Sequence, residues 1–502
     1  MHFITIINRK SAILGQNFAL DSRAHLGKEV SPDRKESSMS GIFGVVTKGE
    51  CVEPLLYGTD YHSHLGTQYG GMAVWGDELR RKIHSIRTSQ FKAKFSEEKY
   101  DLAGHQGIGA VSAIQEQPIC LNSRFGCFAI VMNGWIDNAD ELARGLLEQG
   151  HSFSEVRRGH INQIELLAKI INSGTNIADG IERVFKLIKG SASMLILTEK
   201  GLYAARDRFG YSPLVIGKNG NSWAVTTESG ALTNQHYEIE RYLGPGEVAF
   251  IDGDGTKTVR EPGDRCKTCS FLWIYTGFPT SNYEGINAEC VRERCGRCLA
   301  RRDDVKVDIV GGVPESGVAH AVGYAMESGI PYRRPLVKYT PGYGRSYTPP
   351  TQEERDRVAK MKLLSVGEII RDKRILICED SIVRGTQLKN YTVKKLMEAG
   401  ATEVHVRPAC PPLMFPCKFN ISTRKAEELI ARRAIDAIEG RHIEDVSEYL
   451  DPDGEKYGRM IDWIAKDIGV TTLRYQRLDD MIEAIGLPSE RLCTYCWTGR
   501  ED

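Results

Sequence analysis

The chain has 502 residues with 66 basic and 66 acidic side chains, so its formal net charge at neutral pH is zero. This length is enough for two or three domains with large cores, whereas the balanced charge indicates neither a nucleic-acid surface nor an anionic-membrane surface. No apolar run approaches the roughly 20 residues of a membrane span, so we expect a cytoplasmic protein that binds neither nucleic acid nor membrane.

The first 39 residues differ in character from the rest. They mix basic, acidic and polar groups, and the apolar start from Phe3 to Ile7 is too short for a secretory signal. We expect residues 1–39 to be a disordered leader or the product of a mis-assigned start codon, with Met39 as the true start. A processed propeptide is the alternative, and Ser40 then opens the first domain in either case.

Residues 40–263 predict a layered α+β domain, because short apolar strands alternate with Gly-rich turns and a few helices. The expected strands are Ile42–Val46, Phe128–Met132, Ala192–Leu197 and Glu247–Ile251, and the expected helices are Ala139–Gln149 and Ile164–Ile171. "DGDG" at 252–255 predicts a turn. A Cys-bearing connector follows at 264–284.

Residues 285–440 show a different pattern, in which strands and helices alternate. The expected strands are Val307–Val313, Arg374–Cys378 and Val404–Val406, and the expected helices are Gly317–Glu327 and Gln387–Glu398. Such alternation predicts a parallel, doubly wound α/β sheet. The remaining residues, 441–502, are helical and charged and close on Cys493 and Cys496.

The segment 375–386, "ILICEDSIVRGT", places two carboxylates, Glu379 and Asp380, at the end of a buried strand. Open α/β sheets bind ligands at that edge, and the acids suit a ribose diol and Mg²⁺. A tight loop leading into a helix offers successive N–H groups to a phosphate. Its residues are Ser381, Ile382, Val383, Arg384, Gly385 and Thr386. A chance acidic turn is the alternative, but the whole twelve-residue string is specific.

This string resembles the phosphoribosylpyrophosphate-binding signature of type I phosphoribosyltransferases. The blocks at 311–332, 336–363 and 421–431 resemble those of the glutamine phosphoribosylpyrophosphate amidotransferases, which make phosphoribosylamine at the first step of purine synthesis. The resemblance runs from Ser40 to Gly499. It implies a four-layer α+β Ntn-hydrolase-like domain followed by an α/β type I phosphoribosyltransferase domain with a parallel sheet.

By this resemblance, Ser316, Glu379 and Asp380 are the Mg²⁺ positions, with Glu379 in place of the usual Asp. Lys338, Arg345 and Lys362 match cations of a flexible loop that closes over the pyrophosphate, where they would neutralise the leaving charge. The loop "KYTPGYGRS" carries one extra residue and a Pro-Gly, which affects acceptor choice or loop closure. A solvated charged loop is the alternative for these cations.

Thirteen cysteines, an odd number in a long chain, argue against a disulfide framework. The resemblance implies that Cys269, Cys417, Cys493 and Cys496 hold a structural 4Fe–4S cluster.

Other cysteines leave alternatives. Cys290, Cys295 and Cys298 have a spacing like that of plant-type ferredoxins, but their segment also predicts a helix, which would spread the thiols around its axis. Cys266 forms a Cys-x-x-Cys pair with Cys269 and is a candidate spare thiol.

The first domain resembles the Ntn glutaminases, in which an N-terminal cysteine is the nucleophile and its own α-amine the base. Here that residue is Ser40. The family's Arg for the glutamine α-carboxylate corresponds to Ser112, its Asp for the α-amine corresponds to Gln163, and a further Arg corresponds to Leu65. The oxyanion pair is kept as Asn133-Gly134. Losing two charged partners and a strong nucleophile predicts a glutaminase domain that is inactive.

These observations favour a phosphoribosyltransferase that uses phosphoribosylpyrophosphate and ammonia or another amine. The resemblance also implies a homodimer or homotetramer with a nucleotide feedback ligand. One alternative is a non-catalytic regulatory or scaffold paralogue that binds phosphoribosylpyrophosphate or nucleotide and partners an active enzyme. Another keeps glutaminase activity with Ser40 as the nucleophile.

Overall fold

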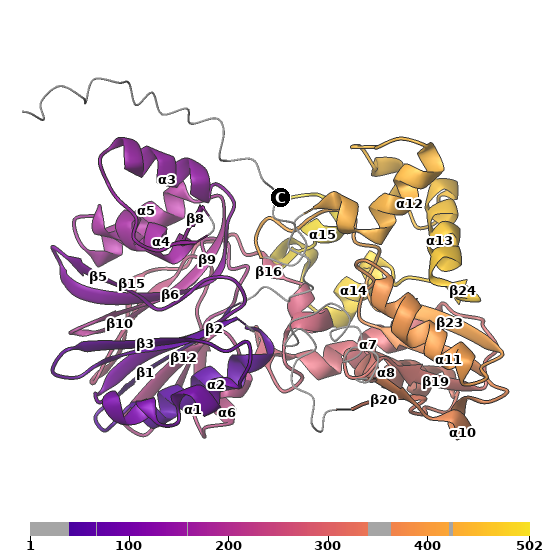
Figure 1. Ribbon diagram of the computed structural model, residues 1–502, viewed down its shortest axis with the longest axis horizontal. Coiled ribbons are helices and arrows are strands. Elements are labelled where there is room, and N and C mark those ends of the chain that lie inside the picture. Colours follow the sequence, from indigo (N-terminus) through magenta and orange to yellow (C-terminus); the bar gives the residue numbers. More distant parts are fainter. Residues whose placement is uncertain (1–39, 67, 158, 340–362, 421–424, 502) are drawn as a thin grey trace, which may run out of the picture.

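The computed structural model describes residues 40–66, 68–157, 159–339, 363–420 and 425–501, which form two lobes (Figure 1). The expectations for the leader therefore lie outside the described residues. Within these ranges, every helix is too short or too polar to cross a bilayer.

The first lobe contains two antiparallel sheets. The seven-stranded sheet has the order β13-β11-β12-β1-β4-β2-β3, and the six-stranded sheet has the order β15-β14-β10-β9-β6-β5. The first consists of β1 (Gly41–Thr47), β2 (Tyr69–Trp75), β3 (Leu79–Ser85), β4 (Gln106–Ser112), β11 (Val215–Asn219), β12 (Ser222–Thr226) and β13 (Glu238–Tyr242). The second consists of β5 (Ile119–Ser123), β6 (Gly126–Ile136), β9 (Gly190–Thr198), β10 (Gly201–Ala205), β14 (Val248–Asp252) and β15 (Gly255–Arg260). A small hairpin joins β7 (Val156–Arg157) to β8 (His160–Ile161).

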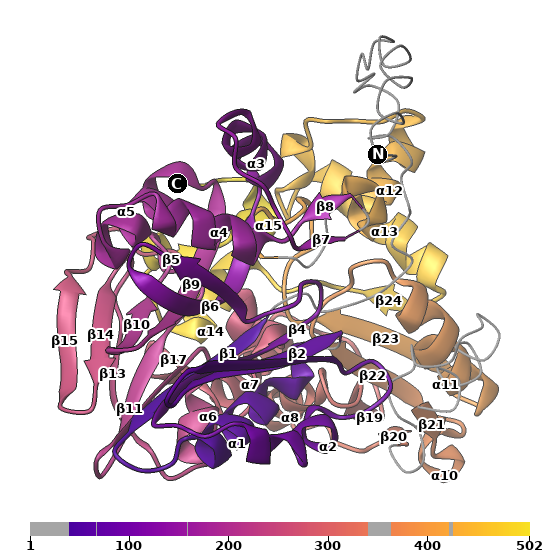
Figure 2. The same cartoon turned by 60° about the vertical axis from the view of Figure 1, so that its left-hand side comes forward.

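Helices cover both outer faces of this pair of sheets (Figures 1 and 2). One layer is α1 (Val52–Tyr61), α2 (Phe91–Phe95) and α6 (Ser229–Thr233), and the other is α3 (Ala139–Glu148), α4 (Gln163–Asn172) and α5 (Ile177–Leu187). Between the sheets lies an apolar core that includes Ile42, Val131 and Leu195. The predicted four-layer α+β fold is confirmed.

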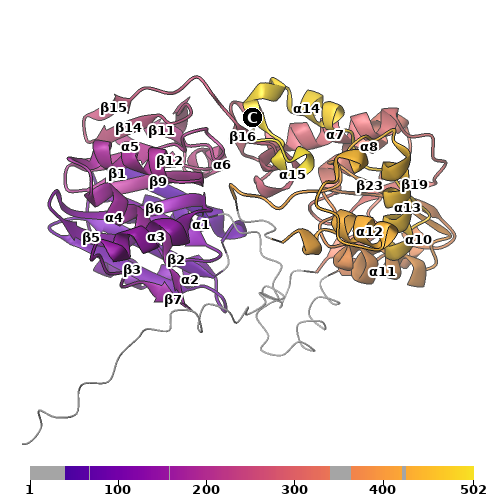
Figure 3. The same ribbon diagram turned by 90° about the horizontal axis from the view of Figure 1, so that it is seen from above.

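The connector joins the lobes through four short elements, β16 (Thr268–Cys269), η3 (Leu272–Thr276), β17 (Asn282–Tyr283) and β18 (Ile286–Asn287). β16 pairs in parallel with β25 (Leu492–Cys493), so the connector is hydrogen-bonded to a segment far along the chain. Figure 3 shows β16 and α15 (Tyr495–Thr498) at the junction of the lobes.

The second lobe contains a parallel sheet of order β19-β22-β23-β24. These strands are β19 (Ile309–Gly312), β22 (Arg374–Glu379), β23 (Glu403–Pro408) and β24 (Thr472–Leu473). Alternate residues of a strand point to opposite faces: Leu376 packs in the core that includes α7 (Ala288–Arg301) and α8 (Val318–Ser328), and Ile375 packs in the opposite core. The predicted parallel α/β domain is confirmed.

The remaining helices and strands complete this lobe. They are η4 (Leu388–Val393), α11 (Lys394–Glu398), α12 (Ile430–Glu439), α13 (Glu455–Ile468), α14 (Leu478–Ile485), α10 (Gly367–Ile370), β20 (Leu336–Lys338) and β21 (Leu363–Ser365). The helix expected over 387–398 opens with the π-helical η4 before α11. The segment 441–502 contributes β24 to the sheet and α13 to its core. The domain limits given above stay a prediction.

Candidate active sites

The first candidate site lies at the carboxyl end of β22. Here the loop after β19 approaches β22 closely, because Val313 N–H donates to the Cys378 carbonyl at 3.0 Å. A Cβ on Gly317 would lie 2.1 Å from the same carbonyl oxygen, so only glycine fits there. This close approach places Ser316 beside the two acids that end β22.

The three residues expected to hold Mg²⁺ are thus brought together. Ser316 Oγ donates to Glu379 Oε1 at 2.6 Å, and the Asp380 amide donates to the same oxygen at 3.1 Å. Burial and the neighbouring Asp380 carboxylate raise the pKa of Glu379. Two adjacent carboxylates and a hydroxyl form an all-oxygen donor set, which suits a hard divalent cation.

The loop after these acids presents its backbone to solvent or ligand. In the described part of the chain, the N–H groups of residues 381–385 donate to no backbone carbonyl. The loop itself is fixed from behind, since Ile430 N–H donates to the Val383 carbonyl at 2.8 Å and Arg384 pairs with Glu428 at 2.5 Å. Gly385 has a φ of +74°, which favours glycine. A rigid loop with available amides is a suitable phosphate cradle.

A residue that sequence reasoning missed reaches this site from the connector. Partial burial, and then the charges of the Asp380 and Glu379 carboxylates, raise the pKa of Tyr275 in η3 to about 12. The buried Arg292 fixes η3, because its guanidinium donates to the carbonyls of Trp273 and Gly277 at 2.9 and 2.6 Å. The connector therefore forms part of the surroundings of the two acids.

The predicted loop cations are only partly described. Lys338 is exposed at the end of β20. Arg345 and Lys362 lie outside the described residues.

The four predicted cluster cysteines come together at the junction of the lobes. Cys269 and Cys493 are paired residues of β16 and β25. Cys496 donates a hydrogen bond to Cys417, which lowers the pKa of Cys417 to about 7. Burial, together with the charge of Cys417, raises the pKa of Cys269 to about 12.

Among the described residues, no three His, Cys, Asp or Glu side chains are close enough to hold one metal ion. In a cubane cluster, however, each thiolate binds a different iron, so its four sulfurs are further apart than the ligands of one ion. Four half-buried, mutually interacting thiols therefore fit a 4Fe–4S cluster rather than a single metal.

The competing cysteines are arranged differently. Cys290, Cys295 and Cys298 lie on α7, as the helical interpretation predicted. Cys290 is exposed, whereas Cys295 and Cys298 are buried. The Cys290 thiol thus points away from the buried face that carries Cys295 and Cys298, and the three thiols do not form one ligand set.

The second candidate site surrounds Ser40, directly before β1. Ser40 Oγ donates to Ser112 Oγ at 3.3 Å and accepts from Gln117 Nε2 at 3.1 Å. Gln117 in turn is held by the backbone of Met132. The hydroxyl of Ser40 is therefore surrounded by neutral groups.

Gln163 is engaged with the backbone. Its Oε1 accepts from Ile136 N–H and its Nε2 donates to the Ile136 carbonyl, each at 3.0 Å. The side-chain amide of Gln163 thus makes the same two hydrogen bonds to Ile136 that the backbone of a neighbouring strand would make. It offers no negative charge to an ammonium group.

Leu65 has an apolar role. It is 2% exposed and packs with Trp273 and Tyr283 of the connector. An arginine position of the resembled family is thus part of the hydrophobic contact between the lobes.

The backbone of the expected oxyanion pair, Asn133-Gly134, requires a glycine at its second position. Gly134 has a φ of +139°, and a Cβ there would lie 2.2 Å from the Ser191 carbonyl oxygen. The buried Asn133 amide has no hydrogen-bond partner among the described residues. It shares the inner face of β6 with Val131, which packs between the sheets.

The cavity beside Ser40 is small. It has a volume of about 10 Å³ and is lined by residues that include Ser112, Gln117 and Gln163. That volume holds about one water molecule, so a glutamine side chain does not fit without rearrangement.

Taken together, the antiparallel sandwich and the parallel sheet with its acid-acid-loop edge define a class II glutamine amidotransferase fold joined to a type I phosphoribosyltransferase. A family model described as a glutamine amidotransferase domain matches residues 108–234.

The chain belongs to the amidophosphoribosyltransferase family. It is 31% identical over 493 residues to the amidophosphoribosyltransferase of Methanocaldococcus jannaschii, covering 92% of this chain and 97% of the relative. The Bacillus subtilis amidophosphoribosyltransferase is 31% identical over 480 residues, covering 92% and 93%. A solved B. subtilis glutamine phosphoribosylpyrophosphate amidotransferase, complexed with ADP and GMP, superposes with a TM-score of 0.79 at 30% identity, covering 92% of this chain and 96% of that one.

Proposed function

We propose that this chain transfers a phosphoribosyl group from phosphoribosylpyrophosphate to ammonia or another amine, and that its glutaminase half is inactive. In this reaction the amine nitrogen forms a bond to C1 of the ribose as the C1–O bond to pyrophosphate breaks. Pyrophosphate leaves with the bonding electron pair, and the nitrogen loses a proton to give a phosphoribosylamine. The proposal implies a role in purine nucleotide synthesis.

The carboxyl edge of β22 supplies the groups for this step. The amides of residues 381–386 would bind the 5′-phosphate, and the acids Glu379 and Asp380 would face the ribose. Lys338, Arg345 and Lys362 would neutralise the departing pyrophosphate. The hydrogen-bonded set of Ser316, Glu379 and Asp380 supports these assignments.

Two cofactors fit the donor sets of this chain. Ser316, Glu379 and Asp380 would hold Mg²⁺, which when bound neutralises charge on the pyrophosphate. Cys269, Cys417, Cys493 and Cys496 would hold a 4Fe–4S cluster. Its role would be structural, because its ligands join the connector to the segments around Cys417 and β25.

The small Ser40 cavity is the observation that carries the claim of an inactive glutaminase. Catalysis by this fold needs a charged partner for each end of the glutamine backbone, and Ser112 and Gln163 are neutral and engaged with other groups. Ammonia would therefore reach the second lobe from solution or from a partner protein.

The relative solved with ADP and GMP supports nucleotide feedback ligands for this chain as well. We further propose a cytoplasmic homodimer or homotetramer.

The test is pyrophosphate release from phosphoribosylpyrophosphate with Mg²⁺, using anaerobically purified protein and either ammonium or glutamine. We expect turnover with ammonium and none above background with glutamine. Glutamine-driven turnover equal to ammonium-driven turnover would contradict the inactive-glutaminase claim.

A second candidate function is a non-catalytic paralogue that binds phosphoribosylpyrophosphate or nucleotide and partners an active enzyme. The altered loop that follows Lys338 favours it. Binding of phosphoribosylpyrophosphate without turnover under any amine, together with co-purification of a catalytic relative, would support this alternative.

A further inference from the structure

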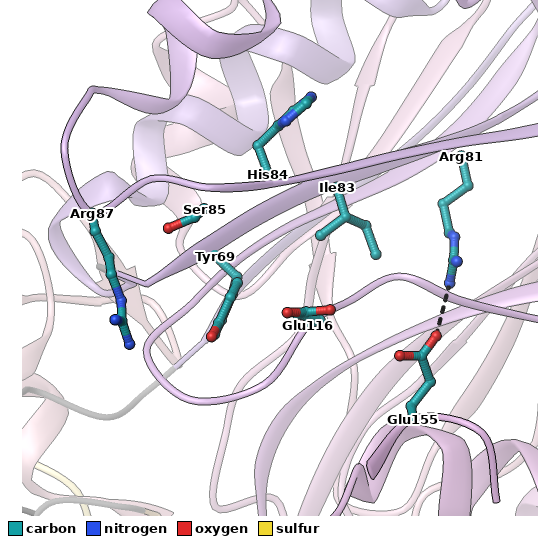
Figure 4. Close-up of a pocket in the computed structure, with 8 residues that line it drawn as sticks. All are labelled: Tyr69, Arg81, Ile83, His84, Ser85, Arg87, Glu116 and Glu155. Carbon is teal, nitrogen blue, oxygen red and sulfur yellow. Dashed lines mark ion pairs between the residues drawn. The ribbon is translucent and has the colours of Figure 1, made fainter. Parts of the chain in front are cut away.

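The first lobe has a second pocket, larger than the Ser40 cavity, which we call the edge pocket (Figure 4). Its volume is about 320 Å³, and its lining includes Tyr69, Arg81, Ile83, Arg87, Glu116 and Glu155. Volumes of this size are at the lower end of those for small-molecule sites. The edge pocket and the Ser40 cavity have no lining residue in common.

One wall of the edge pocket is formed by alternate residues of β3, which is the last strand of its sheet. Arg81, Ile83 and Ser85 point to one face of β3, and Arg81 is the cross-strand partner of Ala73, which packs between the two sheets. The residues on either side of Arg81, Arg80 and Lys82, instead bind Asp101 on the opposite face.

The opposite wall is a loop that is fixed by hydrogen bonds. Asn162 Nδ2 donates to the Glu116 carbonyl at 2.8 Å, and Arg81 Nη1 donates to the Pro118 carbonyl at 3.3 Å. A Cβ on Gly71 would lie 2.2 Å from the Gln117 carbonyl oxygen, so the loop lies directly against β2. The pocket is therefore largely formed before any ligand binds.

The charges that line the pocket are balanced. Two guanidinium groups, those of Arg81 and Arg87, face two carboxylates, those of Glu116 and Glu155 (Figure 4). The His84 ring points away from the other side chains in Figure 4 and pairs with Glu98 at 2.5 Å. A nucleotide would require an excess of positive charge and a metal ion an excess of negative charge, so neither fits this balance.

One pair of these charged groups interacts weakly, whereas Arg87 also donates to Gln68. Arg81 Nη1 and Glu155 Oε1 are 3.8 Å apart, and the two side chains are 35% and 34% exposed. Ion pairs of this length and exposure contribute little to stability. A ligand that carries both charges can therefore replace the pair at small cost.

We propose that the edge pocket binds a zwitterionic α-amino acid. The two guanidinium groups bind the ligand's carboxylate, the two carboxylates bind its ammonium group, and Tyr69 and Ile83 contact its side chain. The site is separate from the position that would hold glutamine for hydrolysis. The proposal does not depend on the proposed transferase reaction, because binding is measured without phosphoribosylpyrophosphate.

The experiment is isothermal titration calorimetry of the full chain with L-glutamine and with L-asparagine. Two analogues of glutamine serve as ligand controls: glutaramate lacks the amine, and 4-aminobutanamide lacks the carboxylate. We expect both amino acids to bind and each analogue to bind at least about tenfold more weakly, since each loses one pair of charge contacts.

Matched variants locate the site. Arg81→Met and Glu116→Gln are expected to weaken binding by about tenfold or more. Arg80→Met, from the opposite face of the same strand, and Glu97→Gln, from an exposed turn, are expected to leave it unchanged. Circular dichroism checks folding, and Glu155→Gln is a further variant of conserved size should Glu116→Gln unfold.

Three outcomes would overturn the proposal. One is no detectable heat with either amino acid at concentrations up to about 10 mM, which corresponds to binding too weak to be specific. The second is equally tight binding of an analogue that lacks one charge. The third is binding that survives Arg81→Met and Glu116→Gln, which would place the amino acid elsewhere, for example near Ser40. Ammonium- and glutamine-dependent rates are measured separately, so failure here leaves the proposed reaction standing.

Discussion

The Ser40 cavity and the carboxyl edge of β22 use their hydrogen-bonding groups in opposite ways. Around Ser40, the side chains of Ser112, Gln117 and Gln163 bind Ser40 or nearby backbone. After β22, the loop amides donate to no backbone carbonyl within the described ranges, and two carboxylates lie side by side.

This difference shows that a fold and the chemistry of its site can be retained independently of each other. The first lobe keeps the strands, the glycine at 134 and the buried Asn133 expected of a glutaminase, yet Ser112, Gln117 and Gln163 already have hydrogen-bond partners within the lobe. The second lobe keeps like charges next to each other, which is unfavourable without a ligand. Adjacent like charges are a stronger indication of function than a retained architecture.

The largest expected effect separates the two sites directly. Asp380→Asn should lower ammonium-dependent pyrophosphate release by about 100- to 1,000-fold, because it removes a charge from the proposed cation site. Ser40→Ala should leave the same rate unchanged. Initial rates at saturating ammonium measure both.

Asp467→Asn is the control for this comparison, since Asp467 forms an exposed ion pair with Lys389. Equal losses in the Ser40 and Asp380 variants would show that the two lobes are not functionally separate.

The cysteines at the junction test whether the lobes depend on one cofactor. Cys493→Ser should remove bound iron and lower the melting temperature by about 5 °C or more, because the cluster's binding energy contributes to folding. Cys290→Ser, at an exposed position on α7, should change neither quantity. Iron and sulfide analysis and thermal unfolding measure the two quantities. Iron loss in the Cys290 variant would instead indicate that the cysteines of α7 are cluster ligands.

Buried histidines give the two lobes a similar pH dependence. Burial lowers the pKa of His62 to about 4, and burial with the nearby Arg292 charge lowers that of His320 to about 3. Unfolded histidine titrates near 6.5, so between these values the unfolded chain binds more protons. The stability contributed by each group is present above about pH 6.5 and falls by up to about 1.4 kcal/mol per pH unit below it.

Melting temperatures between pH 7.5 and pH 5 measure this effect. His62→Gln and His320→Gln should each flatten the pH dependence, whereas His151→Gln, at an exposed position, should not. If only one of the two buried variants flattens it, the lobes unfold separately rather than together.

For one substitution, Ser40→Cys, we expect no effect on glutamine hydrolysis. Ser40→Cys restores the family's nucleophile but neither of its charged partners, and the cavity keeps its small volume. Glutamate release from glutamine should stay at background in this variant. Measurable glutamate would mean that the nucleophile alone limits the first lobe.

Much of the fold could be predicted from sequence, because apolar runs such as Arg374–Cys378 coincide with strands of the sheet. The helix α5 was missed although it carried a signal. Asn176 caps it by accepting from Asp179 N–H, and Ile177, Ile181 and Val184 follow with helical spacing.

A candidate site could be predicted where its residues are adjacent in the sequence. It could not be predicted where its residues are far apart in the sequence. Glu379 and the loop after it are contiguous, so their motif is visible in the sequence. The pairing of Gln163 with Ile136 joins residues 27 positions apart and has no local pattern. The edge pocket draws on two strands and three loops, so its balanced charges appear only in the folded chain.

The parallel pairing of β16 with β25 also affects the order of events on the ribosome. Ser270 beside β16 binds the Cys493 carbonyl across 223 residues of sequence. At translation rates of about 5–20 residues per second, the partner strand β25 is synthesised about 10 to 45 s after the connector. The antiparallel sandwich can fold during that interval, whereas the junction between the lobes is completed only late in synthesis.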